Sequence, residues 1–117
     1  MKKVLIVDDS AFMRLSLRKL LEGNGYQVVG EAENGRVGVD KYKELNPDIV
    51  TLDITMPEMD GLAALNEIIQ FDREAKVVIV SAMGQEAYVK EAVLSGAKNF
   101  VVKPFVNDHV LKVMAQL

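Results

Sequence analysis

Short apolar runs rich in Val and Ile recur five times along the chain, each followed by a longer segment of mixed polarity. The runs lie at Val4–Val7, Gln27–Gly30, Ile49–Leu52, Val77–Val80 and Phe100–Val102. Their apolar character is nearly continuous rather than alternating, which is typical of strands covered on both faces, as in parallel sheets. We therefore expect an α/β fold.

The segments between these runs show the helical spacing of apolar residues. In the first segment, Phe12, Leu15, Leu20 and Leu21 are expected to share a face, and Ser10 can cap the start. The second helix is expected from a cap near Asn34 to Pro47, and the third is expected to begin at Asp60. The fourth is expected to end at Gly96, and the fifth is expected to be capped by Asn107 or Asp108. Five strands thus alternate with five helices, and right-handed crossovers place the helices on both faces of one sheet.

Length, net charge and cysteine content limit the kinds of protein that this chain can be. The chain has 117 residues and a net charge of −3, so we expect one domain over residues 1–117 and no direct nucleic-acid binding. Acidic residues interrupt the N-terminal apolar run before it reaches the length of a membrane span, so membrane insertion is not expected. The chain has no cysteine, which is compatible with a reducing cytoplasm, and we expect a cytoplasmic location.

Charged side chains stand at the ends of three of the predicted strands. Asp8 and Asp9 follow the first run, Asp53 follows the third, and Lys103 follows the fifth. Ligands of open α/β sheets bind outside the carboxyl ends of the strands, so we expect these groups to converge on one crevice. Carboxylate oxygens suit Mg²⁺, which keeps several waters and takes phosphate oxygens as further ligands. The constellation therefore suits phosphoryl transfer.

The turn after the first run argues against a nucleotide or flavin site. Such a site needs a glycine-rich or hydroxyl-rich turn whose N–H groups receive phosphate, whereas this turn reads VDDSAFMR. Asp53 can instead act as a nucleophile and form an aspartyl phosphate, which a metal and a lysine would stabilise. Ser81, at the end of the fourth run, offers a hydroxyl to a phosphoryl oxygen.

Each of these residues also has a structural interpretation. Asp9 could cap the first helix, Asp53 could form a turn before Pro57, and Lys103 could extend from the last strand into solvent. Their joint occurrence with Ser81 favours the functional interpretation.

Over essentially its whole length the chain resembles the receiver domain of two-component response regulators. The matching residues are the pair Asp8 and Asp9, Asp53 in LDITMPEMDG, Ser81 in VIVSAMG, and Lys103 followed by Pro104. Among receivers it looks most like the single-domain chemotaxis regulators of the CheY type. The resemblance implies a flavodoxin-like doubly wound fold, with a five-stranded parallel sheet in the order 2-1-3-4-5 and five helices.

The resemblance also implies a role for each acidic residue. Asp53 would be the phosphoacceptor and would take the phosphoryl group from the phosphohistidine of a sensor histidine kinase. Asp9 and Asp53 would hold Mg²⁺ together with the backbone carbonyl of Thr55, while Asp8 would act largely through water. The protein would be a phosphoacceptor that assists its own phosphorylation and dephosphorylation, and not an enzyme acting on other molecules.

A switch is implied by the same resemblance. Ser81 would move toward the phosphoryl group while the ring of Phe100 turns inward, and Lys103 would contact the phosphoryl group and be joined to Pro104 by a cis peptide. The surface around the fourth helix, the fifth strand and the fifth helix would then change. A flagellar switch protein or another output partner would bind there, and a phosphatase is a further candidate partner.

Two other classes of protein compete with a stand-alone chemotaxis regulator. One is the receiver part of a larger DNA-binding transcriptional regulator. The other is a free-standing metal-dependent phosphatase with an aspartyl nucleophile, which is disfavoured because the sequence shows no second general acid and no substrate-binding cap.

Overall fold

The computed structural model describes residues 1–54, 56 and 59–117. The strands are β1 (Lys2–Val7), β2 (Tyr26–Ala32), β3 (Ile49–Asp53), β4 (Val77–Ala82) and β5 (Asn99–Lys103). The helices are α1 (Ala11–Glu22), α2 (Gly35–Leu45), α3 (Gly61–Phe71), α4 (Glu86–Leu94) and α5 (Asn107–Ala115). Within the described ranges, no helix combines the length and the apolar character that crossing a membrane requires.

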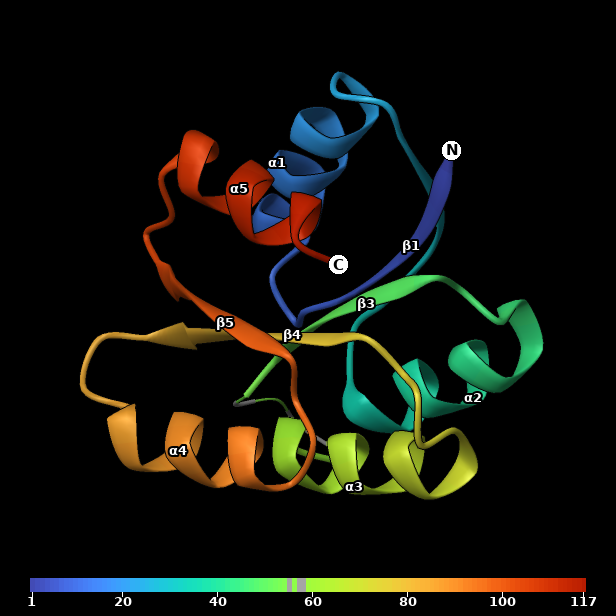
Figure 1. Ribbon diagram of the computed structural model, residues 1–117, viewed down its shortest axis with the longest axis vertical. Coiled ribbons are helices and arrows are strands. Elements are labelled where there is room, and N and C mark those ends of the chain that lie inside the picture. Colours follow the sequence, from blue (N-terminus) through green and yellow to red (C-terminus); the bar gives the residue numbers. More distant parts are fainter. Residues whose placement is uncertain (55, 57–58) are drawn as a thin grey trace.

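One parallel sheet runs through the middle of the molecule in the strand order β2-β1-β3-β4-β5. Helices α1 and α5 cover one face of the sheet, and α2, α3 and α4 cover the other (Figure 1). The expected flavodoxin-like, doubly wound architecture is therefore confirmed. The winding direction changes between β1 and β3, which is the position where sheets of this kind hold their ligands.

The apolar side chains of the strands form two cores, one on each face of the sheet. Neighbouring residues of β3 show the division, because Ile49 packs with α1 and α5 while Val50 packs with α2, α3 and α4. Every residue of β3 is buried. A strand covered on both faces has no solvent side, which explains why its sequence does not alternate between polar and apolar residues.

Side-chain caps define three of the helix starts as predicted. Ser10, Asn34 and Asp60 each accept a hydrogen bond from the backbone N–H three residues later. The predicted cap of the last helix is wrong. Helix α5 begins at Asn107 itself, and Val106 occupies its N-cap position without a side-chain hydrogen bond from the described residues. At this start the N–H of Val110 donates to the carbonyl oxygen of Val106 at 3.1 Å.

The apolar face predicted for the first helix is also partly wrong. Phe12 and Leu15 are exposed, whereas Leu21 is buried as predicted and Leu17, which was not predicted, is buried with it. At 3.6 residues per turn, Phe12 and Leu15 stand about 140° and about 160° around the helix from Leu17, so they cannot share its buried face. Leu20, on the buried side, packs against that core as predicted.

Two glycines allow the segment after β3 to pack closely against its neighbours. A Cβ on Gly61 would lie 2.2 Å from the carbonyl oxygen of Asp53, and one on Gly35 would lie 2.1 Å from that of Met59. The backbone N–H of Gly61 donates to the carbonyl oxygen of Ile54 at 2.7 Å. The start of α3 thereby supports the end of β3, where Asp53 lies.

Thr51 places a polar group inside this core, and its substitution measures how that group affects the free energy of unfolding. Its hydroxyl oxygen is buried and has no hydrogen-bond partner among the described residues. An unpaired buried hydroxyl is unfavourable, and valine keeps the branched shape without it. We expect Thr51→Val to raise the free energy of unfolding by about 1 kcal/mol, measured by urea denaturation.

Thr51→Ser is the matched control. It keeps the unpaired hydroxyl and loses a buried methyl group, so it should lower the stability. A Thr51→Val protein less stable than Thr51→Ser would show that the hydroxyl has a stabilising role.

Candidate functional site

Three carboxylates meet at the carboxyl ends of β1 and β3. Asp8 and Asp9 follow β1, and Asp53 is the last residue of β3. Each offers an oxygen atom, and these atoms all lie within 4.8 Å of one another. Asp8 and Asp53 are buried, whereas Asp9 is exposed. The structure thus brings together the three side chains that the sequence predicted as metal ligands.

Hydrogen bonds from β2 and from the start of α1 orient Asp8. Its backbone N–H donates to the carbonyl oxygen of Ala32 at 3.0 Å, and its Oδ1 accepts from the backbone N–H of Ser10 at 2.9 Å. Ser10 is itself the cap of α1. The structural interpretation of Asp9 as the helix cap is therefore wrong.

The ammonium group of Lys103 lies beside two of the carboxylates. Its Nζ is 2.9 Å from Oδ2 of Asp8 and 3.5 Å from Oδ2 of Asp53. Burial lowers the pKa of Lys103, but the two carboxylates outweigh burial and hold this pKa above its ordinary value. Lys103 therefore turns into the site and does not extend into solvent. Its peptide bond to Pro104 is cis, as the resemblance implied.

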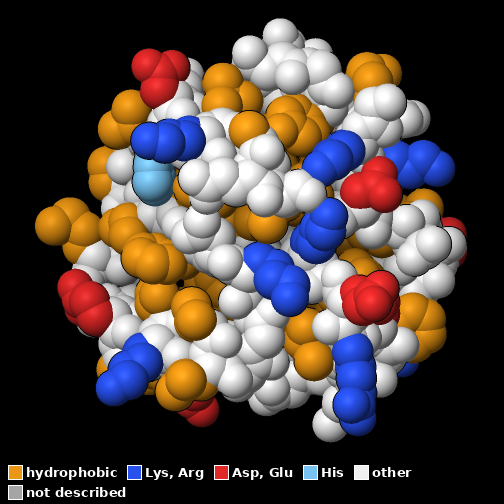
Figure 2. Space-filling view, in the orientation of Figure 1, with side chains coloured by type: hydrophobic (Ala, Val, Ile, Leu, Met, Phe, Trp, Pro, Cys, Tyr) orange, Lys and Arg blue, Asp and Glu red, His pale blue; other side chains and the backbone are white. Residues whose placement is uncertain are grey.

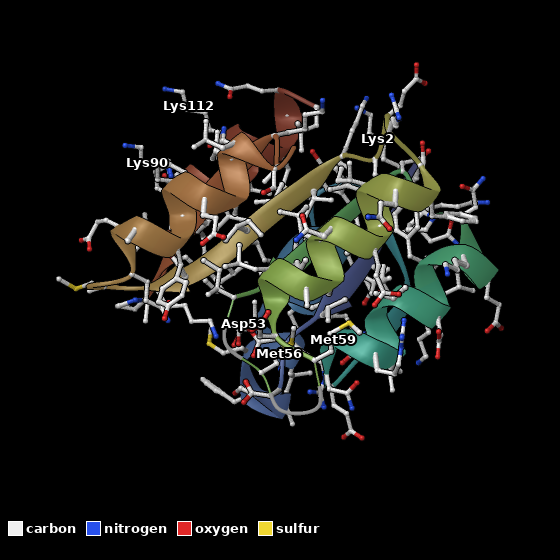
Figure 3. All side chains as sticks on the ribbon, turned by 90° about the horizontal axis from the view of Figure 1, so that it is seen from below. Lys2, Asp53, Met56, Met59, Lys90 and Lys112 are labelled. Carbon is white, nitrogen blue, oxygen red and sulfur yellow. The ribbon has the colours of Figure 1, made fainter. Side chains whose placement is uncertain are left out.

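The backbone of Asp53 is fixed by β4 as well as by α3. Asp53 pairs with Val80 in the sheet, and the N–H of Ile54 donates to the carbonyl oxygen of Val80 at 3.1 Å. Figure 3 shows Asp53 beside Met56 and Met59, at the end of the sheet where α3 begins. The candidate acceptor is thus held at the end of a paired strand rather than on a loop.

Ser81 and Phe100 lie on the two strands beyond β3. Ser81 is buried in β4 and directly follows Val80, the residue that pairs with Asp53. Phe100 lies on β5 and is 40% exposed. Both residues line a mostly apolar hollow of about 470 Å³ between α4 and β5, together with Met83 and Val89. Figure 2 shows hydrophobic side chains gathered over this region, between α4 and α5.

The chemistry of the acidic cluster fits a hard divalent cation. Three carboxylates face one ammonium, so the site is negatively charged, and oxygen donors are what Mg²⁺ prefers. The carbonyl group of Thr55, which the resemblance implied as a further ligand, lies outside the described residues. The described residues of the acidic cluster therefore fit a Mg²⁺ site.

A second polar cluster, behind Asp8, was not predicted from the sequence. Nη1 of Arg14 donates to the backbone carbonyl oxygen of Asp8 at 2.6 Å, and Nε of Arg14 donates to Glu31 at 3.0 Å. Nε of Arg18 donates to the other carboxylate oxygen of Glu31 at 2.7 Å. Burial raises the pKa of Glu31, but the two arginines outweigh burial and lower it.

One sequence signal pointed to part of this cluster. Arg14 and Arg18 are one helical turn apart, a spacing that places them on one helix face. Their shared partner, Glu31, could not be found in the same way. It reaches this face because β2 pairs with β1 in the sheet.

The chain matches one protein family and is similar to several of its members. The family model for the response regulator receiver domain matches residues 4–115. The chain is 57% identical to the chemotaxis protein CheY of Thermotoga maritima over 113 residues, which cover 97% of this chain and 94% of that protein. It is 56% identical to CheY of Bacillus subtilis over 110 residues, covering 94% and 92%.

Solved structures give the same assignment. The crystal structure of the CheX–CheY–BeF₃–Mg²⁺ complex from Borrelia burgdorferi contains a chain that matches with a TM-score of 0.94 and 44% identity, covering 98% of this chain and 87% of that one. The response regulator domain of Thermotoga maritima CheB matches with a TM-score of 0.93 and 36% identity, covering 99% and 95%. With this fold and this cluster of carboxylates at its strand ends, the chain belongs to the response regulator receiver domain family and is a CheY-like receiver.

Proposed function

We propose that this chain accepts a phosphoryl group on Asp53 and carries that signal in a two-component pathway of chemotaxis. One observation carries the proposal: Asp53 ends the buried strand β3 with its carboxylate beside two others and 3.5 Å from the ammonium group of Lys103. The similarity to chemotaxis proteins CheY over nearly their whole length supports chemotaxis as the process.

The reaction is a displacement at phosphorus. A carboxylate oxygen of Asp53 attacks the phosphohistidine of a sensor kinase, so that a P–O bond forms while the P–N bond breaks and its electron pair leaves with the imidazole. Mg²⁺, when bound, supplies positive charge to the phosphoryl oxygens. Asp8, Asp9 and Asp53 are the described residues that would hold it. The protein is then a phosphoacceptor rather than an enzyme acting on other molecules.

Lys103 and Ser81 would bind the new phosphoryl group. Lys103 already lies near Asp53, and the oxygens of a phosphoryl group attached there would give its ammonium group a stronger, charge-assisted partner. Ser81 follows the residue that pairs with Asp53, so its hydroxyl group is on the neighbouring strand. Phosphorylation of β3 would thereby change contacts to both β4 and β5.

The hollow between α4 and β5 supports a switch role for Phe100. Its ring is partly exposed and lines this hollow together with Ser81. A phenylalanine ring has no hydroxyl group that burial would leave unpaired, so turning it inward costs no hydrogen bond. The surface formed by α4, β5 and α5 would change as the ring moves.

The partners would be a sensor histidine kinase and an output protein, with a flagellar switch protein as the leading output candidate. The Borrelia structure is a complex of CheX with CheY, which supports a further protein partner, and we propose a phosphatase in this role. The cytoplasmic location expected from the sequence stays a prediction. A receiver from a DNA-binding regulator has weaker support, because the matched LuxR-family structures are 30% and 26% identical.

The first test concerns the acceptor. Incubation with acetyl phosphate and Mg²⁺ should add one phosphoryl group to the wild-type protein, detected by mass spectrometry of the intact chain. Asp53→Asn should stay unlabelled because its amide lacks the nucleophilic carboxylate. Asp108→Asn removes a carboxylate at the start of α5 and should be labelled like the wild type. A full equivalent of label on Asp53→Asn would remove Asp53 from this role.

The second test concerns the metal. Mg²⁺ at ten times its Kd should raise the free energy of unfolding of the wild type by about 1.4 kcal/mol. Asp9→Asn removes one of three repelling carboxylates, so it should be more stable than the wild type in EDTA and should lose most of the Mg²⁺ increment. Thermal melts with EDTA and with Mg²⁺ measure both effects, with Asp108→Asn as the control. If Asp9→Asn kept the full increment, Asp9 would not be a ligand.

A further inference from the structure

Arg14 lies behind the acidic cluster and bonds to its backbone. Its Nη1 is 2.6 Å from the carbonyl oxygen of Asp8, and its side chain is only 17% exposed. This carbonyl group belongs to the peptide unit that joins Asp8 to Asp9. Because a peptide unit is planar, holding its oxygen sets the orientation of the link between two of the candidate metal ligands.

Glu31 determines where the guanidinium group of Arg14 points. The N–H groups of a guanidinium lie in one plane, so the bond from Nε to Glu31 fixes the direction of the bond from Nη1 to Asp8. The other carboxylate oxygen of Glu31 is held by Arg18, which also pairs with Glu22 at 3.1 Å. Glu31 is thus anchored from α1 on both of its oxygens.

The ion pair with Glu31 also balances the positive charge of the Arg14 guanidinium group. Its described ion-pair partner is Glu31, although it also donates to the backbone of Asp8, which belongs to the cluster of three carboxylates. A guanidinium group released from Glu31 would be attracted to these carboxylates and would compete with a metal ion. Glu31 therefore holds Arg14 in a place where it supports the cluster without neutralising it.

We infer that Arg14, held by Glu31, is a positioning residue for Mg²⁺, because it fixes the peptide unit between Asp8 and Asp9. The inference rests on the proposed metal site. It assigns a role in metal affinity to Arg14 and Glu31, whose described hydrogen bonds and ion pairs connect the backbone of Asp8 to α1 and β2.

Arg14→Lys and Arg18→Lys form a matched pair that tests this inference. Both keep the positive charge and both replace a guanidinium group bonded to Glu31, but Arg18 bonds Glu31 and Glu22 one helical turn farther from Asp8. Lysine has a single ammonium group and does not reproduce the planar pair of donors. The Mg²⁺ Kd of the folded full chain is measured at 25 °C from amide shifts in NMR titrations with MgCl₂.

Arg14→Lys should raise the Kd for Mg²⁺ about tenfold, in the range seen when groups that orient metal ligands are removed, while Arg18→Lys should stay within about twofold of the wild type. Thermal melts in EDTA provide the second readout. A merely structural role would lower the melting temperature of Arg14→Lys and leave its Kd unchanged, and this outcome would overturn the inference.

Glu31→Gln provides an independent variant, because it releases Arg14 without altering it. It should also raise the Kd for Mg²⁺. The increase should persist in high salt, because salt screens the long-range effect of removing the Glu31 charge but does not restore the position of Arg14. Glu22→Gln removes the same charge from the same network and should leave the Kd near that of the wild type. A wild-type protein that binds no Mg²⁺ would overturn the proposed metal site. Wild-type binding with unchanged Kd values in Arg14→Lys and Glu31→Gln would overturn the positioning role alone.

Discussion

Repulsion among three carboxylates at one edge of the sheet is the constraint on which the rest of the site depends. Asp8 and Asp53 are buried, where like charges are screened less than in water. The protein offsets part of this repulsion with the ammonium group of Lys103 and with the N–H of Ser10, which donates to Asp8. Three carboxylates against one ammonium leave two negative charges, which suit a divalent cation, so the proposed metal affinity and the repulsion within the metal-free site would have the same origin.

The parallel sheet makes this gathering of charge geometrically simple. All its strands point the same way, so residues as far apart in sequence as Asp8, Asp53 and Lys103 arrive at one edge. Two cations then contact Asp8 through different atoms. Lys103 faces its carboxylate, whereas Arg14 faces its backbone and has its own carboxylate partner in Glu31. Because their partners differ, the proposed phosphorylation of Asp53 would give Lys103 a new partner while Arg14 would keep Glu31.

Much of the fold could be predicted from the sequence, because burial on both faces leaves a simple signal. The non-alternating runs located all five strands, although each strand extends beyond its run, since main-chain pairing does not require apolar side chains. The buried face of α1 was mistaken at Phe12 and Leu15, where large apolar residues lie on the solvent side. The cap of α5 was mistaken because polar residues at Asn107 and Asp108 are inside the helix.

The candidate site was predictable to the same extent and for a related reason. Strand-end residues can be placed from strand positions alone, which is why Asp8, Asp53 and Lys103 were expected to meet and do meet. The contact between Arg14 and Glu31 depends instead on which strand lies beside β1, and on the direction of a long side chain. The spacing of apolar residues along the sequence indicates neither the neighbour of β1 nor the direction of the Arg14 side chain.

The strands are buried to different extents across the sheet, so they differ in how easily they can shift. The strand that carries Asp53 is enclosed along its whole length, whereas β5 is an edge strand with a single buried residue, Val101. A strand with fewer packed neighbours can shift at lower cost, since local stability follows the density of buried contacts. If Asp53 is phosphorylated as proposed, the change would arise on an enclosed strand and would be accommodated more easily at β5, which lies beyond β4 at the edge of the sheet.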